Sequence, residues 1–75
     1  MTRSNVTAWA RMGNRWACTV RQPYHDIEVW PDGDGYRWVV SRIDPHTGMF
    51  RAVENGTATS LSIAKSAAFN AVRTD

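Results

Sequence analysis

The chain is organised around one stretch, Trp30-Pro31-Asp32-Gly33-Asp34-Gly35-Tyr36-Arg37-Trp38-Val39-Val40. An apolar run ends in this stretch, a segment of proline, aspartate and glycine follows, and an aromatic, β-branched run begins. Because glycine tolerates a positive φ and aspartate suits turns, residues 31–35 predict a reversal of the backbone. The aromatic and β-branched residues after the turn favour a pleated strand. The stretch therefore predicts a β-hairpin at the centre of a sheet.

Alternation of apolar and polar residues predicts two strands before the hairpin. Residues 15–21 place Trp16, Cys18 and Val20 on one face, and Gln22-Pro23 interrupts the run because proline cannot donate to a sheet ladder. Residues 24–30 place His25, Ile27 and Val29 on one face, and Ile27 and Val29 are expected to face the core. The opposite face of that strand carries Tyr24, Asp26, Glu28 and Trp30.

Three further turn signals divide the chain. Gly13-Asn14 suits a two-residue hairpin turn, which favours a short strand over an irregular arm for residues 6–12. Asp44-Pro45-His46-Thr47-Gly48 predicts a loop, after which residues 49–54 return as another strand. Asn55-Gly56-Thr57 predicts the end of that strand.

The hydrophobic period changes in the last segment. Thr59 or Ser60 can cap a helix, and the apolar side chains that follow recur at the three- and four-residue spacing of one helix face. That face consists of Leu61, Ala64, Ala67, Ala68, Ala71 and Val72. Because alanine is small, the helix can approach a sheet closely.

Together, these elements predict an α+β fold, in which an antiparallel β-meander of three to five strands is packed on one face by a single C-terminal α-helix. The other sheet face is predicted to stay open. A chain of 75 residues fits one domain over 1–75, with a core over 15–73 and a frayed segment over 1–5. The predicted core includes Trp16, Ile27, Val29, Trp38, Leu61 and Ala68.

Composition narrows the environment in which the protein is expected to work. The formal net charge is only +2, so long-range attraction to nucleic acid or anionic lipid is predicted to be weak. Since Cys18 is the single cysteine, no intrachain disulfide can form, which favours a reducing compartment. The sequence shows no secretory signal and no apolar run of the ~18–20 residues that span a bilayer. We therefore expect a soluble cytoplasmic protein without membrane contact.

Three motifs resemble a class of small uncharacterised proteins in bacterial and phage genomes. The motifs are Gly35-Tyr36-Arg37-Trp38-Val39-Val40, Ala58-Thr59-Ser60-Leu61 and Ala64-Lys65-Ser66-Ala67-Ala68. The resemblance covers about residues 15–73 and implies a β-meander followed by an Ala-rich C-terminal helix. It implies no catalytic residues. Phage proteins of this size and style include inhibitors of host defence, anti-CRISPR proteins among them, which favours binding to a host protein.

Few groupings in the sequence carry chemistry. His25 and His46 are distant, and with one cysteine they do not supply the three or four convergent ligands of a zinc site. Asp32-Gly33-Asp34-Gly35 lacks the third oxygen position and the closing glutamate of a calcium loop. Asp26 and Glu28 share a strand face as paired acids do, but arginines on neighbouring strands predict ordinary cross-strand ion pairs. We expect no metal, no cofactor and no enzymatic activity.

The remaining prediction is a binding protein. Open-face position and composition select six candidate partner-binding residues: Trp9, Asp26, Glu28, Trp30, Arg37 and Arg51. Arginine and aromatic side chains are enriched at protein interfaces. With the resemblance, they predict a phage- or prophage-encoded inhibitor of a host protein, such as a CRISPR effector, in the host cytoplasm. The alternative is a nucleic-acid-binding module that uses the same arginines and aromatic rings. Homodimerisation through the open face or an edge strand also stays open.

Overall fold

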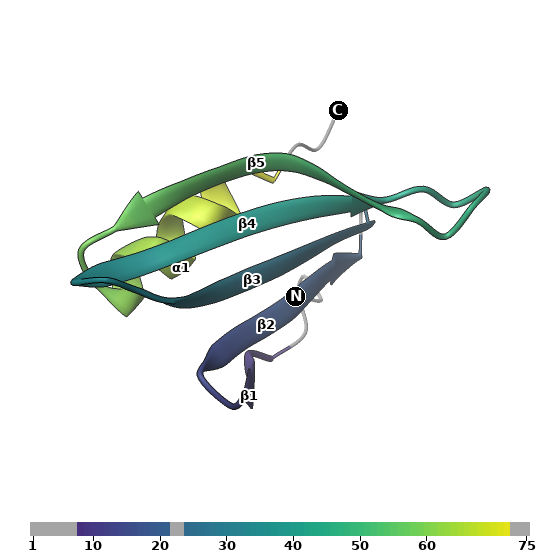
Figure 1. Ribbon diagram of the computed structural model, residues 1–75. Coiled ribbons are helices and arrows are strands. Elements are labelled where there is room, and N and C mark those ends of the chain that lie inside the picture. Colours follow the sequence, from purple (N-terminus) through teal and green to yellow (C-terminus); the bar gives the residue numbers. More distant parts are fainter. Residues whose placement is uncertain (1–7, 22–23, 73–75) are drawn as a thin grey trace, which may run out of the picture.

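The computed structural model of the chain describes residues 8–21 and 24–72. Within these residues, five antiparallel strands form one sheet in the order β1-β2-β3-β4-β5, and one helix packs on a face of it (Figure 1). The elements are β1 (Ala10–Met12), β2 (Arg15–Arg21), β3 (Tyr24–Asp32), β4 (Gly35–Ile43), β5 (Phe50–Ala58) and α1 (Leu61–Asn70). The α+β meander predicted from the sequence is confirmed.

The central hairpin joins β3 to β4 through a turn that is shorter than predicted. Pro31 and Asp32 belong to β3, where they pair with Tyr36 and Gly35. Gly33 occupies the turn with a φ of +62°, a region that glycine adopts without steric cost. Pro31 is tolerated in the strand because the pairing of β3 with β2 ends at Val29, so no β2 residue needs its missing N–H.

The first hairpin joins β1 to β2 through Gly13-Asn14, as the turn signal predicts. Gly13 has a φ of +66°, and Met12 pairs with Arg15 across the turn. The strand predicted within residues 6–12 therefore exists over Ala10–Met12. Residues 6 and 7 of the predicted strand lie outside the described residues. The frayed segment predicted over 1–5 and the interruption predicted at Gln22-Pro23 also lie outside them.

β5 continues through Asn55-Gly56-Thr57, so the prediction that this tripeptide ends the strand is wrong. Gly56 pairs with Trp38 of β4, and a Cβ atom at Gly56 would lie 2.7 Å from Cζ2 of the Trp38 indole. The glycine therefore makes room for a large ring on the neighbouring strand. Nearer the start of β5 the register shifts, because Glu54 pairs with Val40 and Ala52 pairs with Ser41, which leaves Val53 as an extra residue.

Helix α1 follows the N-cap residue Ser60, whose Oγ accepts a hydrogen bond from the backbone N–H of Ile63 at 3.2 Å. The capping bond satisfies one of the donors that the first helical turn leaves unpaired. Ala64, Ala68 and Ala71 are buried against the sheet, as the predicted apolar stripe requires.

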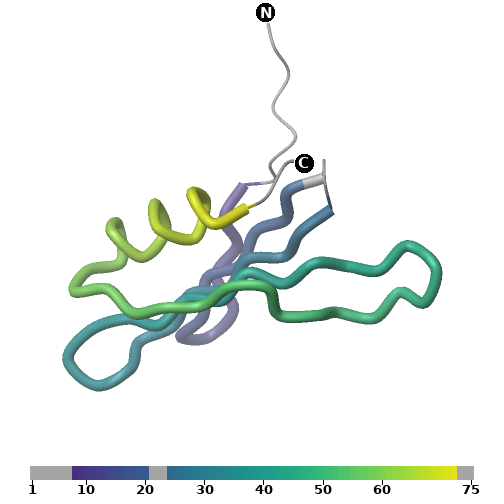
Figure 2. Tube along the Cα trace, turned by 90° about the horizontal axis from the view of Figure 1, so that it is seen from above, coloured from purple at the N-terminus to yellow at the C-terminus, as the bar shows by residue number. Residues whose placement is uncertain are grey.

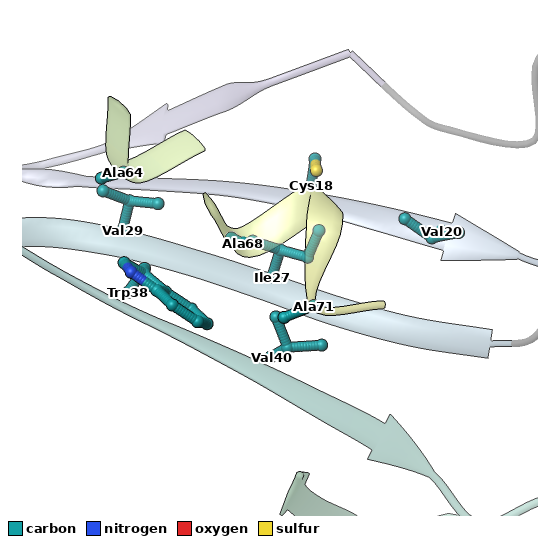
Figure 3. Close-up of a cluster of buried hydrophobic side chains, with 9 residues drawn as sticks. All are labelled: Cys18, Val20, Ile27, Val29, Trp38, Val40, Ala64, Ala68 and Ala71. Atoms are coloured by element: carbon teal, nitrogen blue, oxygen red, sulfur yellow. The ribbon is translucent and has the colours of Figure 1, made fainter. Parts of the chain in front are cut away.

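The core lies between α1 and the sheet (Figure 3). Ile27, Val29 and Val40 have no exposed surface, and the alanines of α1 lie over them. Trp38 is buried as predicted, whereas Trp16 and Leu61 are partly buried and pack against the core. His25 and Cys18 are buried on the same sheet face. Small helix residues above β-branched strand residues allow the two layers to pack closely.

Candidate functional site

The sheet surface opposite α1, called here the open face, carries four of the six predicted partner-binding residues. Asp26, Glu28 and Trp30 of β3 and Arg37 of β4 lie on it, because the residues that alternate with them are buried on the α1 side. Three of the four are partly buried and Arg37 is exposed. The two-residue alternation of β3 and β4 therefore places these side chains as predicted.

Two arginines of the open face, Arg15 and Arg37, are held by acidic side chains of the same sheet. Nη1 of Arg15 lies 2.5 Å from Oε1 of Glu28, and Nε of Arg37 lies 3.0 Å from Oδ2 of Asp32. The Arg15 guanidinium also lies over the Trp30 ring, 4.5 Å from its centroid. Ion pairs that are this exposed contribute about 0–1 kcal/mol to stability. Their larger effect is to orient the side chains and to balance the charge of the surface.

Asp26 occupies the middle of the open face, between its cross-strand partners Thr19 and Ser41. Burial raises the pKa of the Asp26 carboxyl above its usual value, and the nearby charge of Glu28 raises that pKa further. A hydrogen-bond donor or a cation on a partner would offset both effects, because each would favour the ionised form.

Trp9 lies on the α1 side of the sheet, so its predicted place on the open face is wrong. Its ring contacts Phe69 of α1 edge to face, with 5.9 Å between ring centroids. The ammonium group of Lys65 lies 4.9 Å from the centroid of the Trp9 ring and 4.4 Å from that of Trp16. These contacts attach the segment before β1 to the helix, and the prediction that Trp9 binds a partner stays untested.

Arg51 also lies on the α1 side rather than on the open face. It pairs directly with Arg42, which comes two residues after the buried Val40 and therefore lies on the same face of β4 as the buried residues. The predicted placement fails because the extra residue Val53 reverses the alternation of β5, and a single-sequence pattern does not reveal this bulge. A binding role of Arg51 stays a prediction.

Residues 42–51, called here the arm, project beyond the rest of the sheet (Figure 2). The predicted loop at the tip is closed by hydrogen bonds around Asp44. Its backbone oxygen accepts from Gly48 N–H at 2.7 Å, its N–H donates to Met49 O at 3.0 Å, and its Oδ1 accepts from His46 N–H at 2.8 Å. Gly48 has a φ of +73°, which glycine adopts readily. The tip therefore has a defined turn.

The arm carries exposed apolar side chains that are not among the six predicted partner-binding residues. Phe50 is 59% exposed and Met49 is 68% exposed. Phe50 pairs with Ile43, which lies on the open face, and Tyr24 of β3 is 49% exposed on that same face. The signal available in the sequence was an apolar or aromatic residue on each side of the Asp44-to-Gly48 turn. The bulge concealed which face these residues share.

Within 8–21 and 24–72, no group of three or more histidine, cysteine, aspartate or glutamate side chains could hold a metal ion. No helix in that part of the chain has the length and apolar character needed to cross a membrane.

Comparison of the chain with protein-family models, with curated proteins and with solved structures found no match in any of the three.

Proposed function

We propose that this chain is a non-catalytic protein-binding domain that contacts its partner through the open face. The observation that carries this proposal is the apolar group at the arm end of the face, where Phe50 is 59% exposed beside Ile43 and Tyr24 is 49% exposed. Large apolar side chains that are exposed together mark interaction sites more often than isolated ones do. Aromatic anchors beside polar residues are the usual composition of a binding hot spot.

The charges of the open face favour a protein over a nucleic acid as the partner. Arg15 and Arg37 already contact Glu28 and Asp32, so little of their charge is left for phosphate groups. Asp26 adds another carboxyl to the middle of the face, and carboxylates repel phosphates. A balanced surface of this kind suits a protein that carries both signs of charge.

The narrower prediction, a phage- or prophage-encoded inhibitor that acts on a host protein in the host cytoplasm, rests on the sequence resemblance. The exposed open face supports a binding role in general. Capture of the partner from a bacterial lysate, described next, identifies the partner.

The test compares Phe50→Ser with a control of the same chemistry, Ile63→Ser on α1, where Ile63 is 54% exposed. Tagged protein captures partners from a bacterial lysate, and the affinity of each variant is then measured with the purified partner. We expect Phe50→Ser to weaken binding about tenfold or more, and Ile63→Ser to leave it unchanged. Circular dichroism checks that both variants are folded.

Two results would overturn the proposal. Equal binding by both variants would place the contact outside the open face. Binding of short single-stranded or duplex DNA with a steep salt dependence, and loss of that binding in Phe50→Ser, would support the nucleic-acid alternative instead. Sedimentation of the protein alone detects self-association, which would identify a second copy as the occupant of the face.

A further inference from the structure

The arm has two different sides. On the open face it presents Ile43 and Phe50, whereas on the opposite side it presents Arg42 and Arg51 directly across from each other. Both arginines are exposed. Because alternate residues of a strand point to opposite faces, the apolar pair and the arginine pair follow from adjacent positions on the same two strands.

The arginine pair differs from the other charged contacts of the sheet. In the described part of the chain, neither Arg42 nor Arg51 has an acidic side chain within ion-pair distance, whereas Arg15 and Arg37 each have one. Like charges directly opposite each other on neighbouring strands destabilise the pairing. An anion bound between the two guanidinium groups would remove this repulsion, and guanidinium groups bind planar oxyanions with paired hydrogen bonds.

A surface depression of about 470 Å³ accompanies the pair. Its lining consists of Arg42, Asp44, Arg51, Ala52 and Val53. Asp44 is already engaged in the turn, since its Oδ1 accepts a hydrogen bond from the backbone N–H of His46. Ala52 and Val53 line the depression together with the two arginines, so it combines apolar and basic surface.

We propose that the arm binds a segment of the partner protein in which acidic residues alternate with apolar ones. The segment lies along β5, the edge strand of the sheet, so its acidic side chains meet Arg42 and Arg51 on one side of the arm. Its apolar side chains, which point to the other side of an extended chain, meet Ile43 and Phe50. This inference rests on the proposed function and names the chemistry of the partner. A carboxylate is favoured over a nucleic-acid backbone because Arg42 and Arg51 form an isolated pair among the described side chains, whereas nucleic-acid binders present a stripe of basic residues.

The first test uses a short capped peptide of alternating valine and glutamate, since an extended chain of this sequence places its carboxylates on one side. The variant Arg42→Gln/Arg51→Gln lowers the net charge by two. Ser62→Glu/Ser66→Glu is the matched control, because it lowers the net charge by the same amount at exposed positions of α1. We expect the arginine variant to bind the peptide about tenfold more weakly, and the control to bind it nearly as well as the unchanged protein.

Absence of peptide binding by the unchanged protein would overturn the inference. An equal loss of peptide affinity in both variants would also overturn it, because it would indicate long-range attraction only. Tighter binding of duplex DNA than of the peptide, abolished by Arg42→Gln/Arg51→Gln, would assign the pair to phosphate. The purified partner separates the two proposals. If the partner binds Arg42→Gln/Arg51→Gln as tightly as the unchanged protein but no longer binds Phe50→Ser, the arginine inference fails and the proposed function stands.

Discussion

Asp26 lies between Thr19 and Ser41 on the open face, and its partial burial has a cost that depends on pH. Burial, and then the charge of Glu28, raise the pKa of its carboxyl in the folded chain above the usual value of 3.8. The folded chain therefore holds the proton more tightly than the unfolded chain does. The stability from this group is fully present below the unfolded pKa and is lost as the pH rises through the folded pKa. At neutral pH the ionised carboxylate destabilises the fold.

We predict that Asp26→Asn raises the midpoint of thermal unfolding at neutral pH, because the amide keeps the shape of the side chain and removes the buried charge. The gain should shrink as the pH is lowered toward the usual aspartate pKa of 3.8. Thermal melts followed by circular dichroism over a series of pH values measure both effects. Asp34→Asn, in an exposed turn, removes the same charge as a control. A lower midpoint for Asp26→Asn at neutral pH would show that contacts of the carboxylate outweigh its burial.

β5 shows how a strand can pass through residues that usually interrupt one. Gly56 is opposite Trp38, and an added methyl group would lie 2.7 Å from Cζ2 and 2.9 Å from Cε2 of the indole. Trp38 is only 8% exposed, so its ring has little freedom to move away. The buried position of the Trp38 ring therefore requires a residue without a Cβ atom at position 56 of β5.

Gly56→Ala is predicted to destabilise the fold by about 1–3 kcal/mol, the usual cost of overpacking a core. Denaturant unfolding measures the change. The matched background is Trp38→Phe, because phenylalanine lacks the indole atoms that the new methyl group would meet. The indole Nε1 has no hydrogen-bond partner in the described structure, so this background loses no such bond. We expect Gly56→Ala to cost clearly less there, and an equal cost in both backgrounds would contradict the contact.

The sequence predicts the strands and the helix better than it predicts how the strands pair and which face each side chain takes. Two-residue alternation places the side chains of β2, β3 and β4, because buried and exposed positions alternate there without interruption. It misplaces Arg51, because one extra residue at Val53 reverses the alternation and leaves no chemical signature. The register that joins Arg15 to Glu28 likewise depends on the pairing of β2 with β3. Composition supplies candidate partners for each arginine but does not select one.

For the molecule as a whole, the sheet and α1 share one cluster of buried residues, to which β2, β3, β4 and α1 all contribute. The sheet packs against the helix through residues as far apart in sequence as Cys18 and Ala71. Within residues 8–21 and 24–72, no second cluster of buried residues is present to hold part of the fold when this one opens. Small domains of this kind usually unfold in one cooperative step.

Cys18 offers a measure of that cooperativity. It is 3% exposed, and burial, together with the charge of Asp26, raises the pKa of its thiol to about 11. Because the thiolate is the reactive form, both effects suppress alkylation in the folded chain. We predict that iodoacetamide labels Cys18 about 10²–10³-fold more slowly in the folded protein than in the denatured one, as expected for the modest stability of a small domain. Ser62→Cys adds an exposed thiol to the same molecule, and mass spectrometry should find it labelled first.

The same measurement tests whether the distant strands open together. Gly56 and Cys18 lie on strands separated by β3 and β4. If the whole molecule opens at once, Gly56→Ala should speed the labelling of Cys18 by the factor that its loss of stability predicts. If this variant lowers the unfolding midpoint but leaves the labelling rate unchanged, β5 opens independently of β2. The arm, which extends from β4 and β5, would then belong to a part of the molecule that opens while the rest stays folded.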